Sequence, residues 1–230
     1  MTALTNFAAG ARCAVFGASG GIGAAFRDAF SADPRVSKLY IGARHSPNSD
    51  KDRITGFAFD LLSESSIAAA TATMAADGPL DVVLVATGVL HSGEMQPEKS
   101  WKEFTPDAFA RAFAVNATGP ALIAKHVLPL LSRERKSVFA VLSARVGSIE
   151  DNRLGGWTAY RASKAALHQI VRTCAIELAR KNKHAVCVAL HPGTVDTPLS
   201  KPFQRGVPAE KLFTQTESAE HLLRVIDRLT

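Results

Sequence analysis

Short apolar runs recur along the chain, and residues typical of turns follow each of them. Between the runs, apolar residues return every three or four positions, as at Ile22, Phe26 and Phe30. The runs predict buried strands and the longer segments predict amphipathic helices. Strands that alternate with helices and read as continuous apolar runs are typical of a parallel sheet covered on both faces. The expected strands lie at residues 12–17, 38–43, 54–59, 80–87, 137–143 and 184–193. We therefore expect a doubly wound, Rossmann-type α/β fold with helices on both faces of the sheet.

Length and segment composition predict one domain. The chain has 230 residues, of which 47% are hydrophobic, so it can bury one substantial core without needing two. We find no internal repeat, no low-complexity tract and no Pro-, Gly- or Ser-rich linker, so residues 1–230 are expected to fold together. A less regular stretch with four prolines, at about residues 192–216, is expected to be a ligand-binding loop over the carboxyl edge of the sheet.

Cysteine usage and charge narrow the cellular setting. The three cysteines, Cys13, Cys174 and Cys187, share no metal-binding or disulfide pattern, so we expect no metal site and a reducing cytoplasm. The N-terminal residues lack a signal-peptide pattern, and no apolar run is long enough for a bilayer span, so no membrane association is expected. The net charge of +6 is scattered in small clusters, which predicts no nucleic-acid partner.

A glycine-rich segment, "VFGASGGIGAAF", joins the first expected strand to the first helix. Glycine at positions 17, 21 and 23 permits a tight turn and a close approach to a pyrophosphate, while the helix N-terminus offers free amides. This position between strand and helix predicts a dinucleotide-binding turn that also includes Ser19 and Ile22. The alternative is a tight turn with no ligand.

Two residues at later strand ends bear on which dinucleotide binds. The second strand ends in "IGARHS", where Ala43 and Arg44 replace the carboxylate that would hold the ribose of NAD. A planar cation there suits a 2′-phosphate, so NADP(H) is predicted, although Arg44 could also be an ordinary surface arginine. Asp60 closes the third run and either accepts a hydrogen bond from the adenine amino group or caps the following helix.

A tyrosine and a lysine four residues apart, Tyr160 and Lys164, share one face of an expected helix. A phenol with a pKa of about 10 is a poor acid–base catalyst unless its phenolate is stabilised, and the Lys164 cation is placed to lower that pKa. The pair therefore predicts hydride chemistry at a carbonyl, with Tyr160 as general acid and base. The alternative is an ordinary helix-surface pair.

Four motifs in order, "GASGGIG", "VNATGP", "YRASK" and "HPGTVDTPL", give the chain a resemblance to the short-chain dehydrogenase/reductase family. Within it the chain looks most like the C-factor-like and sniffer-like carbonyl reductases. The resemblance implies that Asn116 holds a water that relays protons to Lys164, which also contacts the nicotinamide ribose. It further implies nicotinamide contacts from Pro192, Gly193 and Thr194 and a pyrophosphate contact from Thr197.

Three departures from the family pattern limit this assignment. The turn after the fourth strand reads Ala86-Thr87-Gly88 instead of Asn-Ala-Gly, although Gly88 keeps the close backbone approach to the cofactor. The chain ends in a helix-like segment where relatives continue into a seventh strand, which leaves the oligomeric state, homodimer or homotetramer, open. The position of the family's catalytic serine falls on Ala144 in this chain. We choose the neighbouring Ser143 as the catalytic serine. The alternatives are that Ser148 serves instead or that neither serine does.

These features predict an NADP(H)-dependent oxidoreductase that interconverts a carbonyl and an alcohol in a small-molecule substrate. Trp157, His91, Leu199 and Phe203 are candidates for an apolar substrate pocket, and Arg145 either attracts a substrate carboxylate or ties a loop. The alternative from another class is a dinucleotide-binding signalling or regulatory protein of the C-factor type with little turnover.

Overall fold

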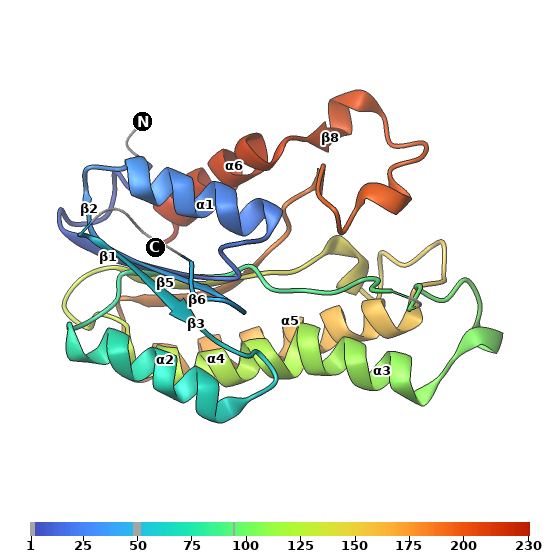
Figure 1. The fold of residues 1–230 in the computed structure, drawn as a ribbon, viewed down its shortest axis with the longest axis horizontal. Coiled ribbons are helices and arrows are strands. Elements are labelled where there is room, and N and C mark those ends of the chain that lie inside the picture. The colour runs from blue at the N-terminus through green and yellow to red at the C-terminus, as the bar shows by residue number, and fades with distance from the viewer. Residues whose placement is uncertain (1–2, 48–51, 94) are drawn as a thin grey trace.

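The predicted doubly wound α/β architecture is confirmed. A computed structural model describes residues 3–47, 52–93 and 95–230 of the chain. Within them one parallel sheet has the strand order β3-β2-β1-β4-β5-β6 (Figure 1). The strands are β1 (Ala11–Phe16), β2 (Val36–Ala43), β3 (Ile54–Ala58), β4 (Val82–Val85), β5 (Ser137–Leu142) and β6 (Ala185–Leu190). The order reverses between β1 and β4, and such a switch point opens a crevice at the carboxyl ends of the strands.

Helices cover both faces of this sheet (Figure 1). One face carries α1 (Gly21–Ala32) and α6 (Gln215–Arg228). The other carries α2 (Glu64–Ala76), α3 (Pro106–Phe113), α4 (Gly119–Val127) and α5 (Thr158–Ala179). In β1, β4 and β5 every strand residue is buried, which explains why these segments read as unbroken apolar runs rather than as alternating ones.

Alternate residues of β5 pack into two separate hydrophobic cores, one on each face of the sheet. Ala140 and Leu142 pack in the cluster beneath α1 and α6, whereas Phe139 and Val141 pack in the cluster beneath α4 and α5. Successive side chains of a strand point to opposite faces, so the residue after Leu142 is directed toward α5. This alternation decides on which face of the sheet the Ser143 side chain lies.

A π-helical turn, Ala114–Thr118, joins α3 directly to α4 in one continuous helical segment. The turn contains Asn116, which is fully buried. Single π-helical turns inside helices are frequent at functional sites. The extra backbone length in this turn directs the Asn116 side chain toward the carboxyl edge of the sheet, where its partners lie.

The proline-containing stretch at residues 192–216 crosses the same edge as a loop with little regular structure. It contains a short parallel pair, β7 (Thr194–Val195) with β8 (Leu212–Phe213), and two 3₁₀ turns, Lys201–Phe203 and Ala209–Lys211. In Figure 1 this stretch extends beyond the sheet at the end where α5 begins. Among the described residues α6 is the last element, and the main sheet has the six strands β1 to β6.

Two features are absent from the described residues. None of the helices has the length and apolar character needed to cross a bilayer. No group of three or more His, Cys, Asp or Glu side chains in that part of the chain is arranged to hold a metal ion.

Candidate active site

The turn between β1 and α1 brings backbone segments into contact that only glycine permits. Gly17 has a φ of +91°, and a Cβ on Gly23 would lie 2.1 Å from the carbonyl oxygen of Gly17. Helix α1 begins at Gly21 with no side-chain cap and no acidic residue in its first turn. Its N-terminus therefore presents a partial positive charge and uncapped amides, a combination that binds anionic groups.

A cavity of about 540 Å³ extends from this turn along the carboxyl edge of the sheet. The Thr87 hydroxyl, which lines it, is buried and has no hydrogen-bond partner among the described residues. A glycine cradle, a helix N-terminus and an orphaned hydroxyl fit a phosphate-containing dinucleotide. The predicted cofactor residues that line this cavity are Ser19, Gly21, Ile22, Arg44, Gly88, Lys164, Pro192 and Thr197.

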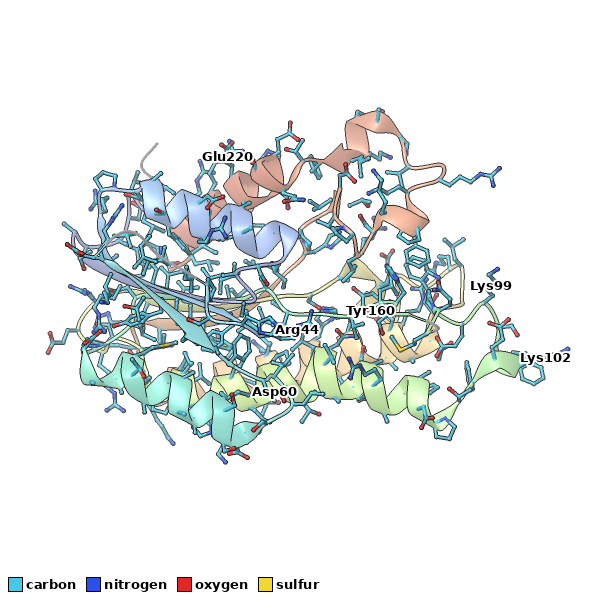
Figure 2. All side chains as sticks on the ribbon, in the orientation of Figure 1. Arg44, Asp60, Lys99, Lys102, Tyr160 and Glu220 are labelled. Atoms are coloured by element: carbon cyan, nitrogen blue, oxygen red, sulfur yellow. The ribbon has the colours of Figure 1, made fainter. Side chains whose placement is uncertain are left out.

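Arg44 lies at the end of β2, where it is exposed and lines the cofactor-side cavity. Figure 2 shows it at the same edge of the sheet as Tyr160. The preceding residue, Ala43, is buried. The structure records no ion pair for Arg44 within the described ranges.

Asp60 does not cap the following helix, so that alternative is wrong. Helix α2 has Ser63 as its N-cap, and the Ser63 hydroxyl accepts from the Ser66 amide. The Asp60 carboxylate instead accepts a hydrogen bond of 2.9 Å from the Leu62 amide, because a short Asp side chain closes a local turn two residues ahead. Asp60 also lies outside the residues that line the cofactor-side cavity.

Tyr160 and Lys164 lie one turn apart on α5, as predicted, and both line the cofactor-side cavity. The Lys164 ammonium donates to the carbonyl oxygen of Leu142 at 3.1 Å and lies 5.8 Å from the centre of the Tyr160 ring. Burial raises the pKa of Tyr160 to about 12 and lowers the pKa of Lys164 to about 8. The expected lowering of the Tyr160 pKa by Lys164 is therefore not seen here, because burial disfavours both charged forms.

Asn116 bridges the end of β4 and helix α5 from the π-helical turn. Its side-chain oxygen accepts from the Val89 amide and its nitrogen donates to the Val89 carbonyl, both at 2.8 Å. The same nitrogen donates to the Ser163 hydroxyl at 3.1 Å. A Cβ on Gly88 would lie 3.4 Å from the Asn116 oxygen and 3.7 Å from the Lys164 nitrogen, so Gly88 separates the two side chains. The structure thus groups Gly88, Asn116 and Lys164 at one point.

Of the two candidate serines, only Ser143 reaches the cavities. Ser143 lines both the cofactor-side cavity and a neighbouring one, and Tyr160 does the same. The Ser143 hydroxyl lies 2.7 Å from Nε2 of His168. Ser148 lines neither cavity, and its hydroxyl accepts from the Asp151 amide. Ala144 lines only the neighbouring cavity. Ser143 and Tyr160 therefore both lie where the two cavities meet.

The neighbouring cavity, of about 230 Å³, lies under the 192–216 loop. Phe203 from that loop packs edge-on against Trp157, with ring centres 4.9 Å apart, and against His91 at 5.6 Å. Gly193 and Thr194 line this cavity, not the cofactor-side one. Its lining contains no Asp, Glu, Lys or Arg side chain within the described residues. Arg145 pairs with Asp151 and its side chain is 73% exposed, so it ties a loop.

The start of α5, just before Tyr160, is held by a residue that the sequence did not single out. Gly155, Gly156 and Trp157 all have positive φ, and Trp157 is the one non-glycine residue in the described chain with this conformation. The Trp157 amide donates to the Glu98 carbonyl at 2.5 Å, and the buried Glu98 carboxylate accepts from the Ala159 amide at 3.3 Å. Glu98 thus replaces the missing N-cap side chain and fixes the first turn of α5.

The structure brings the predicted residues Tyr160, Lys164 and Ser143 to one cavity, but the sequence did not mark several of the residues around them. Gly17 and Gly23 build the turn without lining the cavity, and Asn116 stands behind Gly88. His168 and Glu98 act across the fold on residues distant in sequence, and no local pattern marks them. Other lining residues that were missed lie at the carboxyl ends of strands or in the segments that follow them, a position that signals the ligand-binding edge; they are Val89, Leu142 and His191.

The chain is similar in sequence and in fold to known short chain dehydrogenases. The family model described as short chain dehydrogenase matches residues 12–207. C-signal of Myxococcus xanthus is 34% identical over 160 residues, which cover 70% of this chain and 88% of that protein. NADPH-bound carbonyl reductase from chicken fatty liver superposes with a TM-score of 0.82 at 22% identity, covering 97% of this chain and 93% of that one. Carbonyl reductase Sniffer of D. melanogaster gives 0.80 at 21% identity, covering 95% and 92%.

Proposed function

Because the chain belongs to the short-chain dehydrogenase family, we propose that it is an NADP(H)-dependent oxidoreductase that interconverts a carbonyl and an alcohol. The observation that carries the proposal is the junction of two cavities at Tyr160 and Ser143. One cavity suits a dinucleotide and the other suits a small uncharged substrate. A carbonyl at the junction would lie near a phenol and a hydroxyl that can donate to its oxygen, while the hydride would come from the dinucleotide.

The cofactor-side cavity would hold NADP(H), which supplies the hydride when bound. The turn at Gly17, Gly21 and Gly23 with Ser19 and Ile22 would hold the pyrophosphate, together with Thr197 from the opposite side. Arg44 would pair with the 2′-phosphate, since a guanidinium forms strong charge-assisted hydrogen bonds with phosphate. Chicken carbonyl reductase, with a similar fold, binds NADPH.

Tyr160 would serve as the general acid in reduction. With a pKa of about 12 its phenol is protonated at neutral pH and can donate to the alkoxide oxygen that forms at the substrate. Lys164, held against Leu142, would then place its ammonium beside the phenolate that remains. Asn116 would fix the backbone at Val89 through its two hydrogen bonds. It would thereby hold Gly88 against the Lys164 ammonium and limit the positions open to that ammonium. Ser143 would donate a second hydrogen bond to the substrate oxygen.

The substrate that fits is small, uncharged and largely apolar. The aromatic side chains of Trp157 and Phe203 close one side of the substrate cavity, and no lining side chain among the described residues offers a permanent charge. The loop at 192–216 would act as the substrate loop. We further propose a cytoplasmic homodimer or homotetramer that has no nucleic-acid or membrane partner.

A regulatory role is the second candidate, and two observations favour it. The chain is 34% identical to C-signal, and Ala144 stands where the family resemblance expects the catalytic serine. On this alternative the protein binds the dinucleotide but turns over little substrate. The two candidates make the same prediction for cofactor binding and opposite predictions for turnover.

The test combines both measurements on the purified full chain. Fluorescence titration should show tighter binding of NADPH than of NADH. A panel of aliphatic and aromatic ketones and aldehydes should then accelerate NADPH oxidation, followed by absorbance. Binding without turnover of any member of the panel would favour the regulatory candidate, and failure to bind either cofactor would exclude both.

A further inference from the structure

The histidine that contacts Ser143 has no role in the function proposed above. His168 lies on α5 four residues beyond Lys164 and eight beyond Tyr160, so all three side chains share one face of the helix. Its Nε2 atom is 2.7 Å from the Ser143 oxygen, a full hydrogen bond. The face of α5 that carries Tyr160 and Lys164 therefore also carries His168, the hydrogen-bond partner of Ser143.

The backbone around this pair is held in place on both sides. The Ser143 amide donates to the Leu190 carbonyl at 2.7 Å, which fixes the end of β5 against β6. The 3₁₀ turn Arg145–Gly147 lies directly on α5, because a Cβ on Gly147 would be 2.8 Å from the His168 ring and 2.9 Å from the Lys164 side chain. Only the Ser143 side-chain torsion remains to be set, and His168 sets it.

The direction of this hydrogen bond decides what Ser143 can do. A serine hydroxyl has one proton to donate and can accept up to two. Burial and the Lys164 charge lower the pKa of His168, so the imidazole is neutral at neutral pH and carries its proton on one nitrogen. If that nitrogen is Nε2, the imidazole donates to Ser143 and leaves the serine proton free for another acceptor. That acceptor would lie where the two cavities meet, because Ser143 lines both.

We propose that His168 is a positioning residue that donates from Nε2 to the Ser143 hydroxyl and thereby directs the Ser143 proton at the substrate carbonyl oxygen. The pair supplies the hydroxyl that Ala144 lacks. This inference rests on the proposed carbonyl–alcohol chemistry. It assigns to Ser143 a contact with substrate and to His168 an action through Ser143 alone.

A double-mutant cycle tests the proposal, with kcat and KM measured for the best carbonyl substrate and the Kd of NADPH and the melting temperature measured in parallel. Ser143→Ala should lower kcat by about 100-fold, as loss of one oxyanion donor does in other enzymes. His168→Leu should lower kcat by about 10-fold, with the NADPH Kd unchanged. His168→Gln, which keeps a donor near the Nε2 position, should restore most of that loss. Gln169→Leu, on the exposed side of the same helix, is the matched control and should resemble wild type.

The double variant gives the deciding result. Because His168 acts only through Ser143, adding His168→Leu to Ser143→Ala should lower kcat no further. The proposal is overturned if His168→Leu leaves kcat unchanged or raises it, if the two losses multiply, or if the loss follows NADPH affinity or melting temperature instead of kcat. Wild type that reduces no carbonyl would instead overturn the proposed function, before any variant is compared.

Discussion

Lys164 is expected to cost the folded protein stability, so that replacing it with methionine strengthens the fold while removing a group proposed for catalysis. The side chain is 4% exposed, and burial lowers its pKa from 10.5 to about 8. At about 1.4 kcal/mol per pH unit, this difference corresponds to about 3 kcal/mol of unfavourable free energy for the charged form. The bond to the Leu142 carbonyl returns about 1 kcal/mol, so Lys164→Met should gain about 2 kcal/mol near neutral pH.

The dependence on pH separates this explanation from better apolar packing. Below about pH 8 lysine is protonated in both the folded and the unfolded state, and the whole cost is present. Between about 8 and 10.5 the unfolded state binds more protons than the folded one, so wild-type stability rises with pH. The advantage of Lys164→Met should therefore shrink through that window and disappear above it.

Thermal and urea unfolding at several pH values provide the assay. For a chain of this size, about 2 kcal/mol corresponds to an increase of about 4–8 °C in melting temperature. Lys181→Met, at an exposed position just after α5, is the matched control and should change little. The reasoning is refuted if Lys164→Met is less stable than wild type near neutral pH, or if its advantage does not decline as the pH rises past 8.

Three other outcomes follow from the same geometry. Arg44→Ala should weaken NADPH binding by about 10-fold or more and leave NADH binding nearly unchanged, which fluorescence titration measures; equal effects on both would remove the 2′-phosphate assignment. Gly23→Ala should lower the melting temperature clearly, because its Cβ would lie 2.1 Å from the Gly17 carbonyl, whereas Gly20→Ala, with 3.5 Å to the same oxygen, should change it little. Alcohol oxidation should accelerate from neutral to alkaline pH, because Tyr160 must lose its proton to act as base and its pKa is about 12; a flat initial-rate profile would contradict this.

The parallel sheet was predictable because each strand is marked in the sequence by an apolar run. Strand periodicity also predicts the direction of the Ser143 side chain. Because side chains alternate along a strand, Ser143 points to the face of the sheet opposite Leu142. What periodicity cannot give is the identity of the partner on the facing helix. His168 meets Ser143 only because α5 packs against β5 in one particular register.

Two residues show why capping was harder to predict. Asp60 stands near a helix start and has a suitable side chain, but Ser63 is three residues closer to the first helical turn and forms the cap. At α5 the reverse holds: Trp157 has no capping side chain, and a carboxylate from Glu98, distant in sequence, takes its place. Local propensity describes which residues can cap a helix, whereas the tertiary fold decides which one does.

The buried environment of Tyr160 was also beyond the sequence. A tyrosine and a lysine one turn apart suggest a stabilised phenolate, yet the depth of both side chains favours the neutral forms. The surroundings of Tyr160 depend on the tertiary fold: Trp157 packs edge-on against both Tyr160 and Phe203. A phenol with this raised pKa is protonated at neutral pH, as the proposed role of Tyr160 as general acid requires.

The most direct test of the account compares wild type with Tyr160→Phe in NADPH-dependent reduction of a small apolar ketone, at saturating cofactor. The variant lacks only the phenolic oxygen, so NADPH affinity and melting temperature should match wild type while kcat falls by at least about 100-fold. Reduction by Tyr160→Phe at the wild-type rate would contradict the assignment of Tyr160 as the proton donor and with it the proposed mechanism.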